Sequence, residues 1–268
     1  MNNLSASNLT SVAAPPVWES ATASTPTFSY PGGKCRLAST LVSFMPGSGR
    51  SYVEPFCGRA NVFFRAASTL QFSQCWLNDI RTAPFLNALI SHGDTVEVPQ
   101  QTREEFERQR VAWQINDPTA LLLEPYLTYS GAGFLAGYRP SKGSPRQRRY
   151  QNTLRRAHQI LIQTQATITN LDWKLTIVDL DERDFTYFDP PYLKARVHGY
   201  RSDDLDHKEM IQVLKNARFR WLLSEYEHPL YTDAFGKPFW RKEVQLCATN
   251  FRHDGGLKRR TECLWRNY

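Results

Sequence analysis

One short segment combines the groups needed to hold an amino group that is conjugated to a ring. Asp189, Pro190, Pro191 and Tyr192 follow an apolar run that ends at Phe188. Two prolines stiffen the backbone and remove two N–H donors, so this corner presents a carboxylate, free carbonyl oxygens and an aromatic face. The oxygens can accept the N–H hydrogens of the amine while the tyrosine stacks on the ring. Asp-Pro-Pro also occurs in surface turns, but its place after a buried strand favours the chemical interpretation.

A second segment has the features of a loop that binds a nucleotide-like ligand. A predicted strand ends at Glu54, and Gly58 in the following loop would let the backbone approach a ligand closely. Asp79 ends the next predicted strand, 21 residues after Gly58, where a carboxylate can bind a ribose diol. Ala60 stands where a second glycine is expected. An ordinary strand-to-helix turn would give the same pattern, so these residues alone leave both interpretations open.

The positive charge of the chain is concentrated in one segment. The net charge is +7, and residues 138–156 contain seven basic and no acidic residues, so the remainder sums to zero. A solvated charged face would explain an isolated run of this kind. Because the run lies between two halves of a predicted α/β fold, we expect it to contact a polyanion.

The elements around these segments predict an α/β fold of the doubly wound, Rossmann-like type. Strands are expected at 51–54, 74–77, 176–178, 186–188 and 220–224, with helices at 37–44, 61–70 and 206–216. Residues 244–251 and 261–265 flank Asp254-Gly255-Gly256 and predict a closing β-hairpin. Residues 96–165 lack this alternation and predict a mainly helical insert.

The expected organisation is therefore a tail, two halves of one domain and an insert between them. Residues 1–26 are rich in Ser, Thr, Ala and Pro and are interpreted as a disordered tail. Residues 27–95 and 166–268 form the two halves, on either side of the insert. Five cysteines without a C-x-x-C pair favour a reducing cytoplasm and no metal site, and no apolar run is long enough for a membrane span.

Together these segments resemble the Dam-like family of adenine-N6 DNA methyltransferases. Residues 30–34 (Tyr-Pro-Gly-Gly-Lys) are similar to its aromatic-x-Gly-Gly-Lys element, and residues 53–63 to its Glu-Pro-Phe-x-Gly-x-Gly loop, except at Ala60. Residues 78–80 resemble its acidic second-strand element, 189–192 its Asp-Pro-Pro-Tyr signature and 264–268 its ending. These segments stand in the family order from about residue 28 to 268.

The resemblance implies S-adenosylmethionine as the cofactor. Tyr30 and Lys34 would contact it, with Lys34 near its carboxylate or near Asp189. The methionine pocket would be shaped by Glu54, Phe56 and Gly58, and Asp79 would hold the ribose hydroxyls. Asp172 resembles the acid that meets the cofactor adenine, although a helix-terminal acid fits equally. Ala60 is expected to weaken or reshape cofactor binding without abolishing it.

The resemblance also implies direct methyl transfer to a flipped adenine. Asp189 and the Pro190 carbonyl would accept the hydrogens of the amine, and Tyr192 would stack on the base. Residues 126–139 resemble the family's recognition segment, where Tyr138 or Arg139 would read or replace a base. The expected phosphate contacts are Arg139, Lys142, Arg146, Arg148 and Arg149.

Other interpretations stay open on the sequence. The same corner would serve the N4 amine of cytosine in DNA, or adenine in RNA, and a DNA-binding protein with a decayed site is an alternative from another class. Intact Lys34, Asp79, Asp189 and Tyr192 argue against decay. We expect a monomer, with a weak dimer as the alternative. The pattern does not distinguish a solitary enzyme, a phage product and half of a restriction–modification pair.

Overall fold

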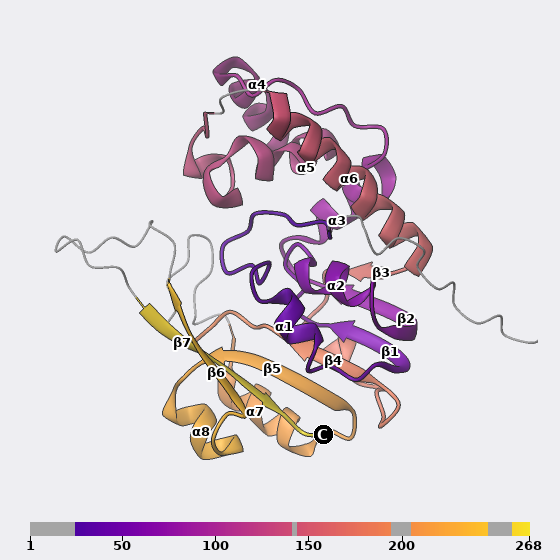
Figure 1. The fold of residues 1–268 in the computed structure, drawn as a ribbon, viewed down its shortest axis with the longest axis vertical. Coiled ribbons are helices and arrows are strands. Elements are labelled where there is room, and N and C mark those ends of the chain that lie inside the picture. The colour runs from indigo at the N-terminus through magenta and orange to yellow at the C-terminus, as the bar shows by residue number, and fades with distance from the viewer. Residues whose placement is uncertain (1–24, 141–143, 194–204, 246–258) are drawn as a thin grey trace, which may run out of the picture.

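The computed structural model describes residues 25–140, 144–193, 205–245 and 259–268. Within these residues one sheet has seven strands in the order β3-β2-β1-β4-β5-β7-β6 (Figure 1). The strands are β1 (Ser48–Glu54), β2 (Gln71–Asn78), β3 (Thr167–Thr169), β4 (Phe185–Phe188), β5 (Arg220–Tyr226), β6 (Trp240–Gln245) and β7 (Arg259–Arg266). Strands β1 to β5 are parallel, whereas β7 runs antiparallel to β5 and β6. The predicted doubly wound sheet with a closing hairpin is confirmed.

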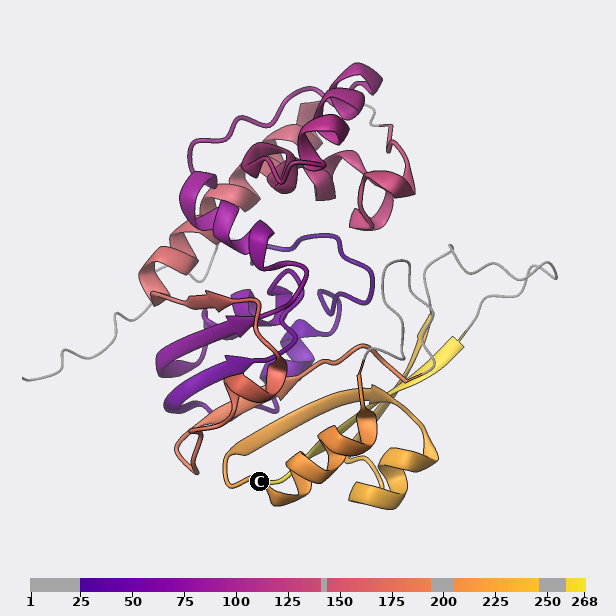
Figure 2. The same cartoon turned by 180° about the vertical axis from the view of Figure 1, so that it is seen from behind.

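The helices lie on both faces of the sheet and at one end of it. They are α1 (Ala38–Val42), α2 (Asn61–Ala66), α3 (Ala83–His92), α4 (Arg103–Trp113), α5 (Pro118–Leu127), α6 (Ser144–Thr164), α7 (His207–Asn216) and α8 (Pro229–Phe235), with 3₁₀ turns η1 (Tyr129–Gly131), η2 (Phe134–Ala136) and η3 (Trp173–Thr176). Figure 1 shows α4, α5 and α6 stacked beyond α3, outside the sheet, and Figure 2 shows α7 on the opposite face from α1.

The alternation of side chains along the strands creates two apolar cores. Successive strand residues point to opposite faces, so Leu222 joins the core under α1 and α2 while Leu223 joins the core under α7 and α8. Leu122 and Leu154 of the helical insert belong to the first of these cores. The insert is therefore packed onto the sheet domain through a continuous apolar layer.

The prediction of a strand at residues 176–178 is wrong. Residues 173–176 form the turn η3, Ile177 donates its N–H to Lys174 at 3.3 Å, and Val178 is exposed. The strand that pairs with β2 is instead β3, nine residues earlier. The β-branched residues at 176–178 favour a strand by propensity, but pairing with the rest of the sheet determines which segment forms one. The turn of the closing hairpin, Asp254 to Gly256, and most of the N-terminal tail lie outside the described residues.

Candidate active site

The candidate site lies at the point where the strand order of the sheet reverses. Strand β1 is followed by β2 on one side, and its other neighbour β4 is followed by β5 on the other side. The loops after β1 and β4 therefore diverge at the carboxyl ends of the strands, the position where open α/β sheets bind ligands and which we call the crevice. Glu54 ends β1, and Asp189 directly follows β4.

A buried ion pair joins the N-terminal turn to the end of β4. Gly33 donates its N–H to the Tyr30 carbonyl at 2.9 Å, and Gly32 has the positive φ of +79° that favours glycine. The turn delivers Lys34 Nζ to 2.7 Å from Asp189 Oδ1, with side-chain exposures of 8% and 18%. The two predicted residues are thus in direct contact.

The two partners shift each other's pKa against the effect of burial. Burial alone would lower the pKa of Lys34, but the carboxylates of Asp189 and Glu262 outweigh it, and the pKa is raised. Burial raises the pKa of Asp189, and Lys34 offsets only part of that rise. The ammonium therefore stays charged and helps to keep Asp189 ionised in a desolvated site.

Glu54 is a buried carboxyl group without a cationic partner among the described residues. Its side chain is 1% exposed and accepts a hydrogen bond from Tyr52 Oη at 2.5 Å. Burial raises its pKa to about 8, and the negative charge of Asp189 adds to the rise. A bound cation would restore its charge, so Glu54 is suited to hold an ammonium group.

Asp79 holds the glycine loop in place. Its Oδ2 accepts a hydrogen bond from Gly58 N at 3.0 Å, and its Oδ1 accepts from Arg81 N at 2.8 Å and Thr82 N at 2.9 Å. An ionised carboxylate has about four acceptor positions, so three are used and one remains for a ligand hydroxyl. Gly58 has a φ of +52°, and a Cβ there would lie 3.3 Å from the Tyr30 ring.

Ala60 adopts a left-handed backbone conformation, which explains why a glycine is expected at this position of the loop. Its φ is +55° and ψ is 29°, a region that costs an L-residue about 1–2 kcal/mol. Its side chain is fully buried in the core under α1 and α2. The extra methyl group is therefore packed in the protein interior, and the strain is the direct cost of alanine here.

The remaining predicted site residues divide between the crevice and other places. Tyr192 is 8% exposed, its hydroxyl donates to Glu262, and Lys34 Nζ lies 4.4 Å from its ring centroid. Phe56 packs on Trp173 and on Phe188, in the core under α7. Asp172 is exposed and caps η3 by accepting from Lys174 N at 2.9 Å. Tyr192 thus lies with Lys34 and Asp189, whereas Phe56 and Asp172 do not.

Asn78 is a structural residue of the site that sequence reasoning missed. Its Nδ2 donates to the carbonyls of Pro55 and Leu171, both at 3.0 Å. Its Oδ1 accepts from Leu171 N at 2.8 Å and from Thr169 Oγ1 at 2.7 Å. One side chain thereby ties the end of β2 to the loops that follow β1 and β3. The available signal in the sequence was an amide side chain at the end of a buried strand, directly before the predicted ribose-binding acid Asp79.

Replacing Asn78 with alanine is expected to destabilise the fold by about 2–3 kcal/mol, because buried backbone groups of two loops lose their partner. Cofactor affinity should fall as well, since the loop that carries Gly58 loses its support. Urea denaturation and calorimetric titration would measure the two effects. Asn216→Ala is the matched control, since the Asn216 side chain is exposed and bonds only its own helix. A loss no larger than that of the control would contradict the role of Asn78.

A buried ion pair also connects the loop after β1 to the insert. Arg59 contacts Glu124 of α5, with side-chain exposures of 6% and 5%, and donates to the Ser29 carbonyl. Gly131 packs so closely on this region that a Cβ would lie 2.0 Å from Ser29 O. The segment that resembles a recognition element therefore rests on the residue before Tyr30. Arg59 lies between Gly58 and Ala60, where the sequence pattern specifies no residue type.

The predicted DNA-contacting residues have different environments. Tyr138 Oη donates to Gln101 O at 2.7 Å, and Arg146 donates to Gln101 Oε1 at 2.6 Å and Tyr126 O at 2.8 Å. Arg139 is half-buried, and Arg148 and Arg149 are exposed on α6. Lys142 lies outside the described residues. The structure therefore uses Tyr138 and Arg146 inside the insert and leaves Arg148 and Arg149 facing solvent.

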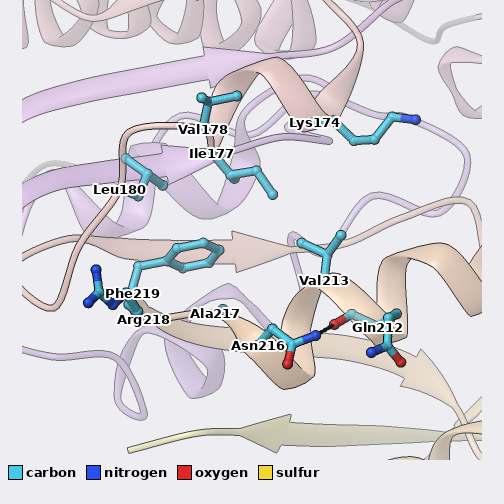
Figure 3. A pocket seen from close by; sticks show the side chains of 10 residues that line it. All are labelled: Lys174, Ile177, Val178, Leu180, Gln212, Val213, Asn216, Ala217, Arg218 and Phe219. Carbon is cyan, nitrogen blue, oxygen red and sulfur yellow. Dashed lines mark hydrogen bonds between the residues drawn. The ribbon is translucent and has the colours of Figure 1, made fainter.

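A pocket of about 480 Å³ lies elsewhere, between residues 174–180 and 212–219 (Figure 3). It borders the start of β5, whereas Asp189 follows the end of β4, and no acidic side chain lines it. It is therefore separate from the candidate site. The described part of the chain contains no group of His, Cys, Asp and Glu suited to a metal ion. In the same residues, no helix has the length and apolar character to cross a membrane.

Comparison with known proteins gives one family match and several structural matches. Residues 30–235 match the model of the D12 class N6 adenine-specific DNA methyltransferase family. A possible methylase from Clostridium difficile 630 is 15% identical, with 88% of this chain and 52% of that chain covered and a TM-score of 0.39. The structure titled "SMU.472, a putative methyltransferase complexed with SAH" is 10% identical, with 90% and 54% covered and a TM-score of 0.38.

A third structure is titled as a predicted N6-adenine-specific DNA methylase from Listeria monocytogenes str. 4b F2365. It is 16% identical, with 92% of this chain and 53% of that chain covered and a TM-score of 0.34. The chain spans about half the length of these three structures. No curated protein matches it.

Proposed function

Because the chain belongs to the D12 class of N6-adenine-specific DNA methyltransferases, we propose that it methylates the N6 amine of an adenine flipped out of duplex DNA. The observation that carries this proposal is the contact between Lys34 and Asp189 at the end of β4. It supports a role for Asp189 as an acceptor at the end of β4, where it is followed by two prolines that have no N–H donors of their own.

S-adenosylmethionine is the methyl donor of this family, and its sulfonium supplies an electrophilic methyl group. The crevice fits such a molecule. Glu54 offers a buried carboxyl group that lacks a cation, which suits the amino group of the methionine part. Asp79 keeps one acceptor position for a ribose hydroxyl, and Gly58 packs against Tyr30 without a side chain of its own.

Asp189 and the Pro190 carbonyl carry the chemistry of the base. The lone pair of the adenine amine is delocalised into the ring, which makes the nitrogen a weak nucleophile. When these two oxygens accept the amine hydrogens, the nitrogen becomes more tetrahedral and its lone pair turns toward the methyl group. Positioning and local electrostatics then supply most of the acceleration, and we assign Tyr192 the stacking contact with the base.

The helical insert, residues 96–165, is proposed to bind the duplex. It carries the basic segment of the chain, and Gly131 seats it against Ser29 beside the crevice. A base that leaves the duplex beside the insert would therefore be directed toward Asp189 at the end of β4. Arg148 and Arg149 are the exposed candidates for phosphate contacts.

Replacing Arg148 and Arg149 with alanine is expected to flatten the salt dependence of DNA binding. Each lost phosphate contact should reduce the slope of log K against log salt by about 0.9, with little change in stability. Fluorescence anisotropy over a salt series would measure this. The double variant Lys215→Ala/Lys237→Ala removes the same charge from exposed positions near α7 and α8 and is the control. An equal slope in both double variants would place the duplex elsewhere.

The proposal is tested by the product. The purified chain is incubated with isotopically labelled S-adenosylmethionine and methylation-free duplex DNA, and the digested nucleosides are analysed by mass spectrometry. The expected product is labelled N6-methyl-2′-deoxyadenosine. N4-methylcytosine, or transfer to RNA alone, would favour the two amine alternatives that the same corner could serve. DNA binding without any transfer would favour a decayed enzyme.

A further inference from the structure

We propose that Glu262 is a positioning residue for methyl transfer. Glu262 accepts a hydrogen bond from the Tyr192 hydroxyl, and it shares the Lys34 ammonium with Asp189. The Asp189 oxygens therefore stay available to the substrate amine. This inference rests on the proposed function. Glu262 lies outside residues 30–235, which match the family.

The closing hairpin brings Glu262 to the crevice. Strand β7 runs antiparallel to β5, so the early part of β7 lies at the edge where the parallel strands end. Glu262 pairs in register with Tyr226, the last residue of β5. It shares a strand face with Leu264, which belongs to the core under α1 and α2. Its side chain is 3% exposed, although nothing in a sheet core requires an acid there.

The Tyr192 hydroxyl lies between two carboxylates. It donates to Glu262, and it is also close enough to Asp189 to lower the pKa of that group. A phenol has one proton to donate, and burial keeps the pKa of Tyr192 well above its usual value. When Glu262 accepts this proton, Asp189 does not, and its lone pairs remain free for the hydrogens of the amine.

Glu262 also fixes the direction of the Lys34 ammonium. The three groups around Nζ are Asp189 Oδ1 at 2.7 Å, the Gly32 carbonyl at 3.2 Å and Glu262 Oε1 at 3.7 Å. At 3.7 Å, Glu262 attracts the ammonium by its charge and not through a hydrogen bond. Without the Glu262 charge, the ammonium would be attracted to Asp189 alone and would compete more strongly with the substrate amine.

Several other charged or titratable groups surround Glu262 and must be considered in any pH effect. They are Lys34 from the N-terminal turn, Asp189 and Tyr192 after β4, Tyr187 in β4, Glu225 and Tyr226 in β5, and Lys242 opposite in β6. Lys34 is the buried cation of this set, and Lys242 is exposed. Removal of the Glu262 charge therefore acts chiefly through Lys34 and its other partner Asp189.

The test is the variant Glu262→Gln, which keeps an acceptor for Tyr192 but removes the charge. We expect kcat to fall about 10- to 100-fold, with KM for DNA and cofactor changed less than about threefold. The acid limb of the kcat profile should move to lower pH, because Lys34 then pairs with Asp189 alone and lowers the pKa of that carboxylate. Glu243→Gln, on the solvent face of β6, is the matched control.

A variant pair separates positioning from structure. Tyr192→Phe removes the hydroxyl that holds Glu262 Oε1 toward Lys34, so it should lower kcat as well, and adding Glu262→Gln should then cost less than it does alone. This variant also decides the matter if Glu262→Gln does not fold. An unchanged kcat and acid limb in Glu262→Gln, or an unchanged kcat in Tyr192→Phe, would overturn this inference about Glu262 and leave the proposed function standing. Absence of methyl transfer by the unaltered protein would overturn the proposed function, and the inference with it.

Discussion

Replacing Asp189 with alanine is expected to lower kcat by about 10³-fold or more. The carboxylate is the acceptor of the amine hydrogens in our proposal, and Lys34 Nζ lies 2.7 Å from its Oδ1. Its removal takes away the group that draws the amine hydrogens and leaves the ammonium facing the substrate nitrogen. The Kd for duplex DNA should change by less than about tenfold, because the insert that we propose as the DNA contact does not contain Asp189.

Single-turnover kinetics with saturating cofactor would measure the first effect, and anisotropy the second. Asp189→Asn is a useful companion, because it keeps one acceptor oxygen while removing the charge, and it should retain more activity than alanine does. Asp233→Ala, an exposed carboxylate on α8, is the control. Activity of Asp189→Ala within about tenfold of the unaltered protein would remove the basis of the proposed chemistry.

The fold and the first members of the site could be predicted because their signals are local. Strand-ending acids and glycine loops depend on a few neighbouring residues, and so does the Asp-Pro-Pro-Tyr corner. Parallel strands bring their carboxyl ends to one edge, so the position of Asp189 next to Glu54 follows from the strand order. The resemblance placed Lys34 near the cofactor carboxylate or near Asp189, and the structure shows the contact with Asp189.

The residues that were missed depend on long-range pairing. Glu262 reaches the crevice only because β7 inserts antiparallel beside β5, about seventy residues after Tyr192. An acid on a strand with apolar residues on both faces was its available signal. The strand at 176–178 was predicted wrongly for a related reason, since short β-branched runs do not specify their own pairing. The buried contact of Arg59 with the insert had no local signal at all.

Replacing Glu124 with alanine is expected to destabilise the protein by about 3–5 kcal/mol, because it removes the carboxylate that neutralises the buried Arg59 guanidinium. The carboxylate also accepts from Gly133 N at 2.7 Å and Thr128 Oγ1 at 3.1 Å. Its loss would loosen the turn that packs on Ser29. Denaturant unfolding would give the free energy. Glu107→Ala breaks an exposed pair with Arg103 and should cost less than about 1 kcal/mol.

A second variant distinguishes the charge from the hydrogen bonds. Glu124→Gln combined with Arg59→Met removes both charges and keeps an acceptor for Gly133, so it should recover more than half of the stability lost in Glu124→Gln alone. Cofactor affinity should stay reduced in the double variant, because Arg59 Nη1 no longer holds the Ser29 carbonyl beside Tyr30. Equal stability of Glu124→Ala and the Glu107 control would mean that the pair does not join insert and loop. Recovered stability with lost cofactor affinity would instead show that Arg59 supports the proposed methyl-donor site through its contact with Ser29.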